Sequence, residues 1–327
     1  MAKSYRHLTR DQRCQIYTLK ERGDSLAEIA RVLGIHRSTI TRELQRNSRA
    51  NSYRYENAHQ QAQDRRKQSH SLKMTPEMIL VIEEKLKIDW SPEQIAGWLK
   101  KQGREYVSYE TIYKHVWADK KKGGALYKHL RHNGKKYNKR SKGTAGRGCI
   151  PGRIDIKERP QIVEEKTRLG DWELDTIIGA QHQGAIVSMV DRVAKLLKLA
   201  KVSHKTKEKV NDALLKKLQP IKEFVLTATS DNGKEFAGHQ EISIALEAGF
   251  FFATPYHSWE RGLNEHTNGL IRQYFPKGTN FDNISEEDVE KVEALLNNRP
   301  RKSLGFETPL EAFHRLASGD SERLSFA

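Results

Sequence analysis

Cysteine is almost absent from this chain of 327 residues, since Cys14 and Cys149 are its only two and lie far apart. Cysteines so placed form neither a disulfide framework nor a zinc-ligand spacing, and they suit a reducing compartment. No stretch approaches the roughly 18–20 consecutive apolar residues of a membrane span. The first residues, MAKSYRHLTRDQ, also lack the apolar core of a secretion signal. The sequence therefore predicts a cytoplasmic protein without disulfides, zinc or membrane contact.

Acidic residues are too few to balance the basic ones: 58 Lys and Arg face 42 Asp and Glu, a net charge of +16. The excess lies in one half of the chain. Residues 1–160 hold 36 Lys and Arg against 17 Asp and Glu, whereas residues 161–327 hold 22 against 25. Neutralisation of phosphates supplies most non-specific affinity for DNA. We therefore expect the first half to bind nucleic acid, since a merely well-solvated basic surface would not concentrate its charge in this way.

The first 50 residues have the pattern of a helix-turn-helix domain. Thr9 and Gln12 form a capping box before a helix that runs to about Lys20, and Gly34 supplies the turn between two later helices. The last helix, HRSTITRELQR, turns its apolar residues inward and a polar face outward, which we expect to enter the major groove of DNA. That face carries Arg37, Ser38, Thr41, Arg42 and Arg46. The alternative is a three-helix bundle without a DNA-binding role, which the basic charge disfavours.

A second helical unit is predicted over residues 75–130. Its helices are expected in TPEMILVIEEKLK, SPEQIAGWLKK and SYETIYKHVWAD, the first two with Pro at the first helical position. The unit is richer in aromatic residues than the first. It therefore either contacts DNA as a second helix-turn-helix-like unit or packs against protein, and the sequence leaves both open.

One polar segment lies between the two helical units, and another follows the second unit. Residues 51–74 are compatible with a helix at first and then loop-like, while residues 131–160 are dominated by Gly, Pro, Lys and Arg. We interpret both as linkers, the second strongly basic. The predicted domains are therefore residues 1–50, 75–130 and 161–327.

From residue 161 the pattern becomes α/β. Three strand-like runs joined by tight connections come first, in DWELDTIIGA, GAIVSMVDR and KLLKLAKV. A helix, a strand, a helix, a strand and the long helix SWERGLNEHTNGLIRQYF follow. Strands joined by tight turns pair antiparallel, and helical crossovers make parallel neighbours. This order predicts a ribonuclease-H-like fold with a mixed sheet.

Three carboxylates fall on these elements among apolar neighbours: Asp175 in the first strand, Asp231 directly after the fourth, and Glu265 on the last long helix. A buried unpaired charge is costly, so their convergence makes sense if a cation neutralises them. Hard oxygen ligands suit Mg²⁺ or Mn²⁺. Two such ions about 3.5–4 Å apart can promote displacement at a phosphodiester. Each carboxylate alone is a weak signal: Asp231 could be a turn residue in SDNG, and Glu260 competes with Glu265.

The longest specific blocks of the chain are GDWELDTIIG, TSDNGKEF, PYHSWERGLNEHTNGLIRQYFPKGT and LNNRPRKSLGFETPLEAF. In these blocks, and in its N-terminal helix-turn-helix, the chain resembles the DDE transposases of the insertion sequence thirty family of bacterial insertion elements. The resemblance implies a retroviral-integrase-like catalytic core in which Asp175, Asp231 and Glu265 are the catalytic, metal-binding triad. It also matches Arg272 to a basic residue that these enzymes often carry, and we expect Arg272 to contact DNA.

The resemblance implies an enzyme that binds the terminal inverted repeats of its element through the N-terminal helices. It would hydrolyse DNA at the element end and join the released 3′-hydroxyl to target DNA, with the same metal pair serving both steps. Because two ends must be held together, we expect a homodimer or a larger assembly, associated with the bacterial nucleoid through DNA.

Two other functions remain open from the sequence. The chain could be a DNA-binding transcriptional regulator with an inactive catalytic domain, although a pure regulator has no need for three convergent carboxylates. It could also be a ribonuclease-H-like nuclease that cuts DNA without strand transfer. Failure to join DNA ends would distinguish that nuclease from a transposase.

Overall fold

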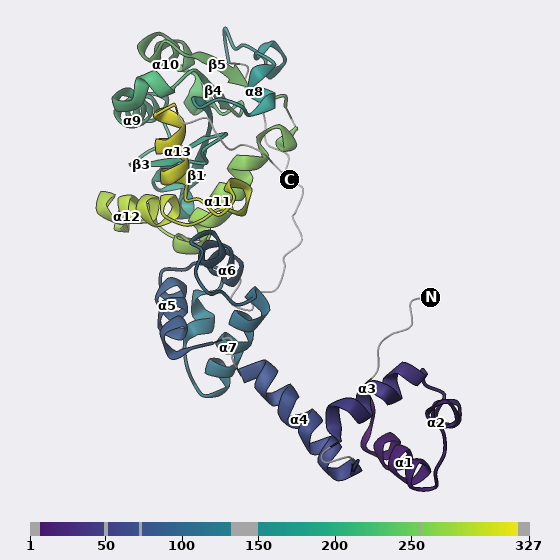
Figure 1. The fold of residues 1–327 in the computed structure, drawn as a ribbon. Helices are drawn as coiled ribbons and strands as arrows, with labels where there is room; N and C mark the ends of the chain where they lie inside the picture. Colours follow the sequence, from purple (N-terminus) through teal and green to yellow (C-terminus); the bar gives the residue numbers. More distant parts are fainter. Residues whose placement is uncertain (1–6, 49–51, 72–73, 132–149, 256, 320–327) are drawn as a thin grey trace. The chain divides into compact units, whose positions relative to one another are not determined.

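Two compact units make up the chain, Met1–Ile79 and Leu80–Ala327, and each is described by itself. The computed structural model, shown in Figure 1, describes residues 7–48, 52–71, 74–131, 150–255 and 257–319.

The first unit has the predicted helix-turn-helix fold. The capping box of Thr9 and Gln12 is present at its first helix, and Gly34 ends the second helix in the left-handed conformation, with φ 62°. Ile16, Ile29 and Ile40 are fully buried where the first three helices meet. The helices of this unit are α1 (Arg10–Glu21), α2 (Leu26–Leu33), α3 (Arg37–Asn47) and α4 (Tyr55–Ser71).

Helix α4 occupies most of the segment that the sequence predicts as a linker. Tyr53 and Ala58 are buried in the same apolar core as α1, α2 and α3. Arg65 of α4 donates a hydrogen bond to Asn47 at the end of α3. The first half of this segment is helical, as the sequence allows, but the helix runs on to Ser71 and joins the core of the first unit, so the interpretation as a linker is corrected over α4. The segment is polar, and the few residues that complete the core are too widely spaced to show a helical apolar face.

The second helical unit has its three predicted helices, α5 (Pro76–Lys87), α6 (Pro92–Lys101) and α7 (Tyr109–Lys121). Helix α6 packs against a segment near the C-terminus: a Cβ atom added to Gly97 would lie 2.3 Å from the ring of Phe306. Lys101 forms an ion pair of 3.1 Å with Glu307 of the same segment. Of the two roles that the sequence leaves open, α6 therefore has at least that of packing against protein.

The α/β domain is built on one mixed sheet of five strands in the order β3-β2-β1-β4-β5. The first three strands pair antiparallel, and β1 with β4 and β4 with β5 pair parallel. This is the order expected of a ribonuclease-H-like fold, and the prediction is confirmed. The strands are β1 (Asp171–Ile178), β2 (Ala185–Asp191), β3 (Leu197–Val202), β4 (Thr227–Ser230) and β5 (Gly249–Phe252).

Helices cover both faces of this sheet, and each face has an apolar core. Trp172 and Leu174 of β1 lie in the core under α9, α10 and α13, while Ile177 lies in the core under α11 and α12. Because side chains alternate along a strand, Glu173 and Asp175 point to the face covered by α11. The helices are α9 (Lys207–Leu218), α10 (His239–Leu246), α11 (Gly262–Tyr274), α12 (Glu286–Asn297) and α13 (Pro309–Ala317).

The basic segment predicted as the second linker lies in part, over residues 132–149, outside the described residues. The end of that segment belongs to the α/β domain, since Ile150 is buried in its core and Asp155 forms a parallel bridge with Phe252. No helix in the part of the chain that the structure describes is long and apolar enough to cross a membrane.

Candidate functional site

Asp175 lies in the middle of β1 and faces α11. Its carboxylate accepts a hydrogen bond of 2.9 Å from the backbone N–H of Thr176 and one of 2.7 Å from the side-chain amide of Asn268. Burial raises the pKa of this carboxyl group and the charge of Asp231 raises it further, while Arg261 opposes the shift. The ionised form of Asp175 is therefore destabilised by its surroundings, so a nearby cation would stabilise it.

Asp231 directly follows β4, the parallel neighbour of β1. One of its carboxylate oxygens accepts a hydrogen bond of 3.0 Å from the backbone N–H of Gly233, as a turn residue does. Its other oxygen is directed to Arg261. Asp231 therefore both stabilises a turn, as the sequence suggests, and lies near Asp175.

A single arginine on the chain just before α11 joins these two aspartates. The Arg261 guanidinium lies 3.8 Å from an oxygen of Asp175 and 3.7 Å from an oxygen of Asp231. Two carboxylates from neighbouring strands therefore share one positive charge. The sequence analysis missed Arg261, although it lies four positions before Glu265 and seven before Asn268, a spacing that puts all three on one side of a helix.

Glu265 lies in the first turn of α11 and its side chain is exposed. The structure does not bring it together with the two aspartates as a metal site: among the described residues, no three Asp, Glu, His or Cys side chains are grouped closely enough to hold an ion. Arg261 and Asn268 before and after it both contact Asp175. Glu265 is therefore on the part of α11 that faces β1.

Glu260, the competing third ligand, lies in the short 3-10 helix Ser258–Arg261 before α11. Its carboxylate accepts a hydrogen bond of 2.8 Å from the backbone N–H of Thr254 and lies 3.2 Å from Nδ1 of His257. Glu260 thus closes the turn after β5, and the regular helix begins at Gly262 as expected. This placement favours Glu265 over Glu260.

A second acidic residue of β1, Glu173, has a role that the sequence analysis did not find. It is buried, and it accepts a hydrogen bond of 3.2 Å from the backbone N–H of Asn264 in the first turn of α11. Arg192 lies 3.6 Å from its carboxylate, and burial raises the pKa of Glu173. Glu173 therefore holds the start of α11 against β1. One feature of the sequence could have indicated this role: Glu173 lies two residues before Asp175, and so on the same face of the strand.

Arg272, which the sequence analysis expects to contact DNA, binds backbone oxygens of its own chain. Its guanidinium donates to Ile178 at the end of β1 at 2.9 Å, and to Phe275 and Pro276 at 3.4 Å each. Burial lowers the pKa of Arg272. In this arrangement Arg272 ties the end of α11 to β1, and its contact with DNA stays a prediction.

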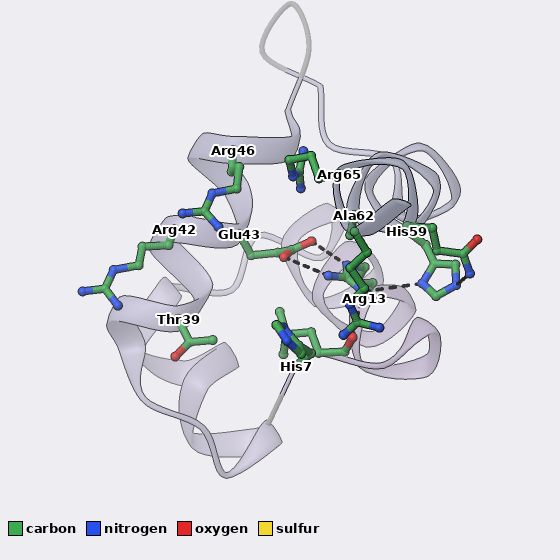
Figure 2. Close-up of a pocket in the computed structure, with 12 residues that line it drawn as sticks. His7, Arg13, Thr39, Arg42, Glu43, Arg46, His59, Ala62 and Arg65 are labelled. Carbon is green, nitrogen blue, oxygen red and sulfur yellow. Dashed lines mark hydrogen bonds and ion pairs between the residues drawn. The ribbon is translucent and has the colours of Figure 1, made fainter. Parts of the chain in front are cut away.

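The predicted DNA-reading face of α3 is held in place by a buried ion pair. Arg13 of α1 donates to Glu43 of α3 at 2.7 Å, and the hydroxyl group of Tyr53 donates to the same carboxylate at 3.2 Å. Figure 2 shows this pair at the inner side of α3, with Arg42 and Arg46 on the same helix. Both arginines are exposed and line a cavity of about 420 Å³ between α3 and α4.

The other residues of that face differ in what their side chains contact. Arg37 is exposed, whereas Ser38 and Thr41 are half-buried. The hydroxyl group of Ser38 lies 2.8 Å from Nδ1 of His36, and that of Thr41 donates to the backbone oxygen of Arg37 at 3.2 Å. The three arginines are therefore the long, exposed donors of this face.

Comparison with known proteins identifies the family of the chain. The helix-turn-helix domain family matches residues 4–47. The chain is 46% identical to the transposase for insertion sequence element IS4351 of Bacteroides fragilis, over 97% of this chain and 98% of the relative. It is 34% identical to transposase InsI for insertion sequence element IS30A of Escherichia coli strain K12, over 94% of this chain and 84% of the relative. The chain belongs to the insertion sequence thirty family of transposases.

This transposase is also similar to solved integrase domains over less than half of its length. The catalytic core domain of BIV integrase covers 46% of this chain and 97% of its own, with 20% identity and a TM-score of 0.37. The HTLV-2 integrase catalytic core domain, solved in complex with magnesium, covers 45% and 97%, with 18% identity and a TM-score of 0.36. The strand order and pairing of this domain define its ribonuclease-H-like fold by themselves.

Replacing Arg42 by Ala tests whether α3 of this transposase reads sequence. If Arg42 contacts a base edge through both guanidinium nitrogens, its loss should cost about 1–3 kcal/mol on element-end DNA and less on a scrambled duplex. A gel-shift titration of both duplexes measures the difference. Arg31→Ala is the matched control, because Arg31 is exposed on α2 and paired with Glu28. Equal losses on both duplexes would show that Arg42 contacts only phosphate.

Proposed function

We propose that this transposase binds the terminal repeats of its element through α1–α3, cuts the DNA at the element end, and joins the released 3′-hydroxyl to target DNA. The observation that carries the proposal is the convergence of Asp175 and Asp231 on one positive charge beside α11. Two carboxylates from neighbouring strands, one of them destabilised by burial, suit chemistry in which a cation must be held against DNA phosphate. Membership of the transposase family over nearly the whole chain supports the same activity.

The side chains at this site fit a divalent cation in their chemistry. Asp175 and Asp231 supply hard oxygen ligands of the kind that Mg²⁺ and Mn²⁺ prefer, and Glu265 is the proposed third ligand. We propose two such ions, which when bound would supply activation of the attacking oxygen and neutralisation of the leaving oxygen.

The remaining side chains orient the carboxylates. Asn268 and the backbone N–H of Thr176 each hold one oxygen of Asp175, which sets the direction of that carboxylate. Asn264 donates to the backbone oxygen of Leu174 at 3.1 Å, and its own N–H binds Glu173. These contacts fix the first turns of α11 against β1, which supports Glu265 of the first turn as the proposed third ligand.

Joining of DNA requires that more than one copy of the chain take part. Both ends of an element must be held at the same time, and each copy has one helix-turn-helix domain in its first unit. A homodimer or a larger assembly on the paired ends is therefore part of the proposal.

The decisive experiment supplies a precleaved element end with a free 3′-hydroxyl, a target plasmid and Mg²⁺ to the full-length protein. We expect end-to-plasmid joined products, because the 3′-hydroxyl is the attacking group. A 3′-deoxy end should give none, and EDTA should abolish joining because the carboxylates need a cation.

Each outcome of that experiment has a distinct meaning. Cutting of the uncleaved end without any joining would identify a nuclease, and binding with neither reaction would identify a DNA-binding regulator. Undiminished joining in EDTA would overturn the metal-ion chemistry but not the transposase function.

A further inference from the structure

A second cluster of charge, separate from the aspartates, lines a cavity of about 550 Å³ between α6, α11 and the chain after α12. Three arginines line it: Arg131, Arg299 and Arg301. Lys302 and Glu93 also line it and form an ion pair of 2.7 Å with each other. Because Lys302 and Glu93 neutralise each other, the remaining charged groups of the lining, apart from histidine, are three guanidinium groups and one carboxylate, that of Asp89.

Arg299 is buried among uncharged partners. Only 3% of it is exposed, and its guanidinium donates to the side-chain oxygen of Gln273 and the hydroxyl group of Tyr274. Its Nε has no hydrogen-bond partner in the part of the chain that the structure describes. Asp89 is close enough to favour the charge of Arg299, but its carboxylate also lies 2.9 Å from Nδ1 of His129. Arg299 is therefore charged and only partly compensated.

Arg301 is still less compensated. Within the described residues, the one hydrogen bond of its guanidinium goes to the backbone oxygen of Leu296, at 3.0 Å. Burial lowers the pKa of Arg301 to about 10, and the charges of Arg299 and Arg131 contribute to the shift. The three arginines thus lie close enough to repel one another.

The third arginine rests against α11. A Cβ atom added to Gly269 would lie 3.0 Å from the guanidinium of Arg131, so the absence of a side chain at Gly269 leaves room for it. Arg131 is exposed, which leaves the cavity open to solvent on its side. His266 and Leu270 of α11 line the cavity as well.

The cavity is on a different flank of α11 from the aspartates. Asn268 of α11, which contacts Asp175, and His266, which lines the cavity, are two positions apart, roughly 160° around a helix at about 100° per residue. A DNA strand lying across α11 could therefore meet both flanks. Like charges gathered in a partly buried place are costly unless an anion neutralises them, and arginine binds phosphate through two parallel hydrogen bonds.

We propose that this cavity binds a phosphate group of the DNA backbone and holds DNA against α11. The site suits a phosphodiester because three partly compensated guanidinium groups line it and Arg131 leaves one side open to solvent. The inference rests on the proposed action on DNA ends but not on the identity of the metal ligands. The competing explanation is structural, namely that the arginines fasten the end of α5 to the α/β domain through Asp89.

The test measures binding of the full-length protein to duplex DNA across a range of salt concentrations, with EDTA present so that no cleavage occurs. Arg301→Gln and Arg131→Gln should each lower the slope of log affinity against log salt by about one, the value for one lost phosphate contact. The loss should be equal on element-end and scrambled duplexes, because phosphate carries no sequence. Lys216→Gln is the control, since Lys216 is exposed on α9 and should leave the slope unchanged.

A second measurement locates the contact. Neutral methylphosphonate linkages are placed one at a time along the duplex, and binding of the wild type should fall at one or two of them. At those positions Arg301→Gln should show no further loss, whereas Arg301→Lys, which keeps the charge, should still respond. This outcome would establish the phosphate contact even if the variants were somewhat less stable.

Three results would overturn the inference. The first is an unchanged salt slope in both variants with a lowered melting temperature, which would make the arginines structural. The second is the same methylphosphonate profile in wild type and Arg301→Gln. The third is stabilisation of the wild type by inorganic phosphate while the variants bind DNA as the wild type does, which would make the cavity a site for a free anion. Binding in EDTA is measured apart from cleavage, so failure here is distinct from failure of the proposed catalysis.

Discussion

Replacing Asp175 by Asn should reduce cleavage of element ends about 100-fold to 1,000-fold, the range found when one preorganised electrostatic contact to a reacting centre is removed. Asn keeps the shape of the side chain but removes the negative charge that a cation needs. Binding of the same DNA should be unchanged, because the helix-turn-helix domain lies in the other unit of the chain. Single-turnover cleavage and a gel shift on one substrate measure the two effects.

The folded state should tolerate this change. The pKa of Asp175 is raised by burial, so the ionised carboxylate at neutral pH opposes folding, and a neutral amide removes that opposition. We therefore expect a melting temperature no lower than that of the wild type. Asp212→Asn is the matched control, because Asp212 is exposed on α9. Equal cleavage by the two variants would remove Asp175 from the proposed chemistry.

Replacing Glu265 by Gln should likewise abolish most cleavage while DNA binding remains, whereas Glu260→Gln should stay largely active. The reason is position: Glu265 lies between Arg261 and Asn268 on the side of α11 that faces Asp175. Glu260 instead accepts the backbone N–H of Thr254 in the turn after β5. The pair is informative because the chemical change is the same at both sites.

Strand cleavage and repeat binding are measured for both glutamine variants, with melting temperature as the check on folding. Loss of cleavage in Glu260→Gln alone would move the third ligand to Glu260. Full activity in both variants would show that neither glutamate is the third metal ligand.

Local patterns along the chain were enough to predict most elements. The capping box at Thr9 and the prolines at the first helical positions of α5 and α6 mark helix starts that the structure confirms. The order of strands and helices after residue 161 predicts the mixed sheet, because tight turns and helical crossovers leave little choice of pairing. The packing of α4 into the core escaped prediction, since its contribution consists of a few residues near Tyr53 and Ala58 in a polar stretch.

Some residues of the candidate site could likewise be predicted from the sequence, and others only from the structure. The sequence alone indicated Asp175, Asp231 and Glu265, because carboxylates on strands and helices with apolar neighbours are unusual, and the family resemblance pointed to the same three residues. It did not single out Arg261 or Glu173, because their positions on one face gain a meaning only once their partners, far away in the sequence, are known. In the sequence, an arginine just before a helix or a glutamate on a strand looks the same whether its side chain faces solvent or a partner of opposite charge.

By itself, then, the sequence determined the fold class, the transposase family and the residues that carry charge, because periodicity, capping and motif spacing are local properties of the chain. Tertiary structure alone decided which charges meet. It put one arginine between Asp175 and Asp231, and gathered Arg131, Arg299 and Arg301 at a cavity beside α11. Such contacts depend on how the sheet and its helices pack, and no local pattern in the chain encodes the distance between residues that only folding brings together.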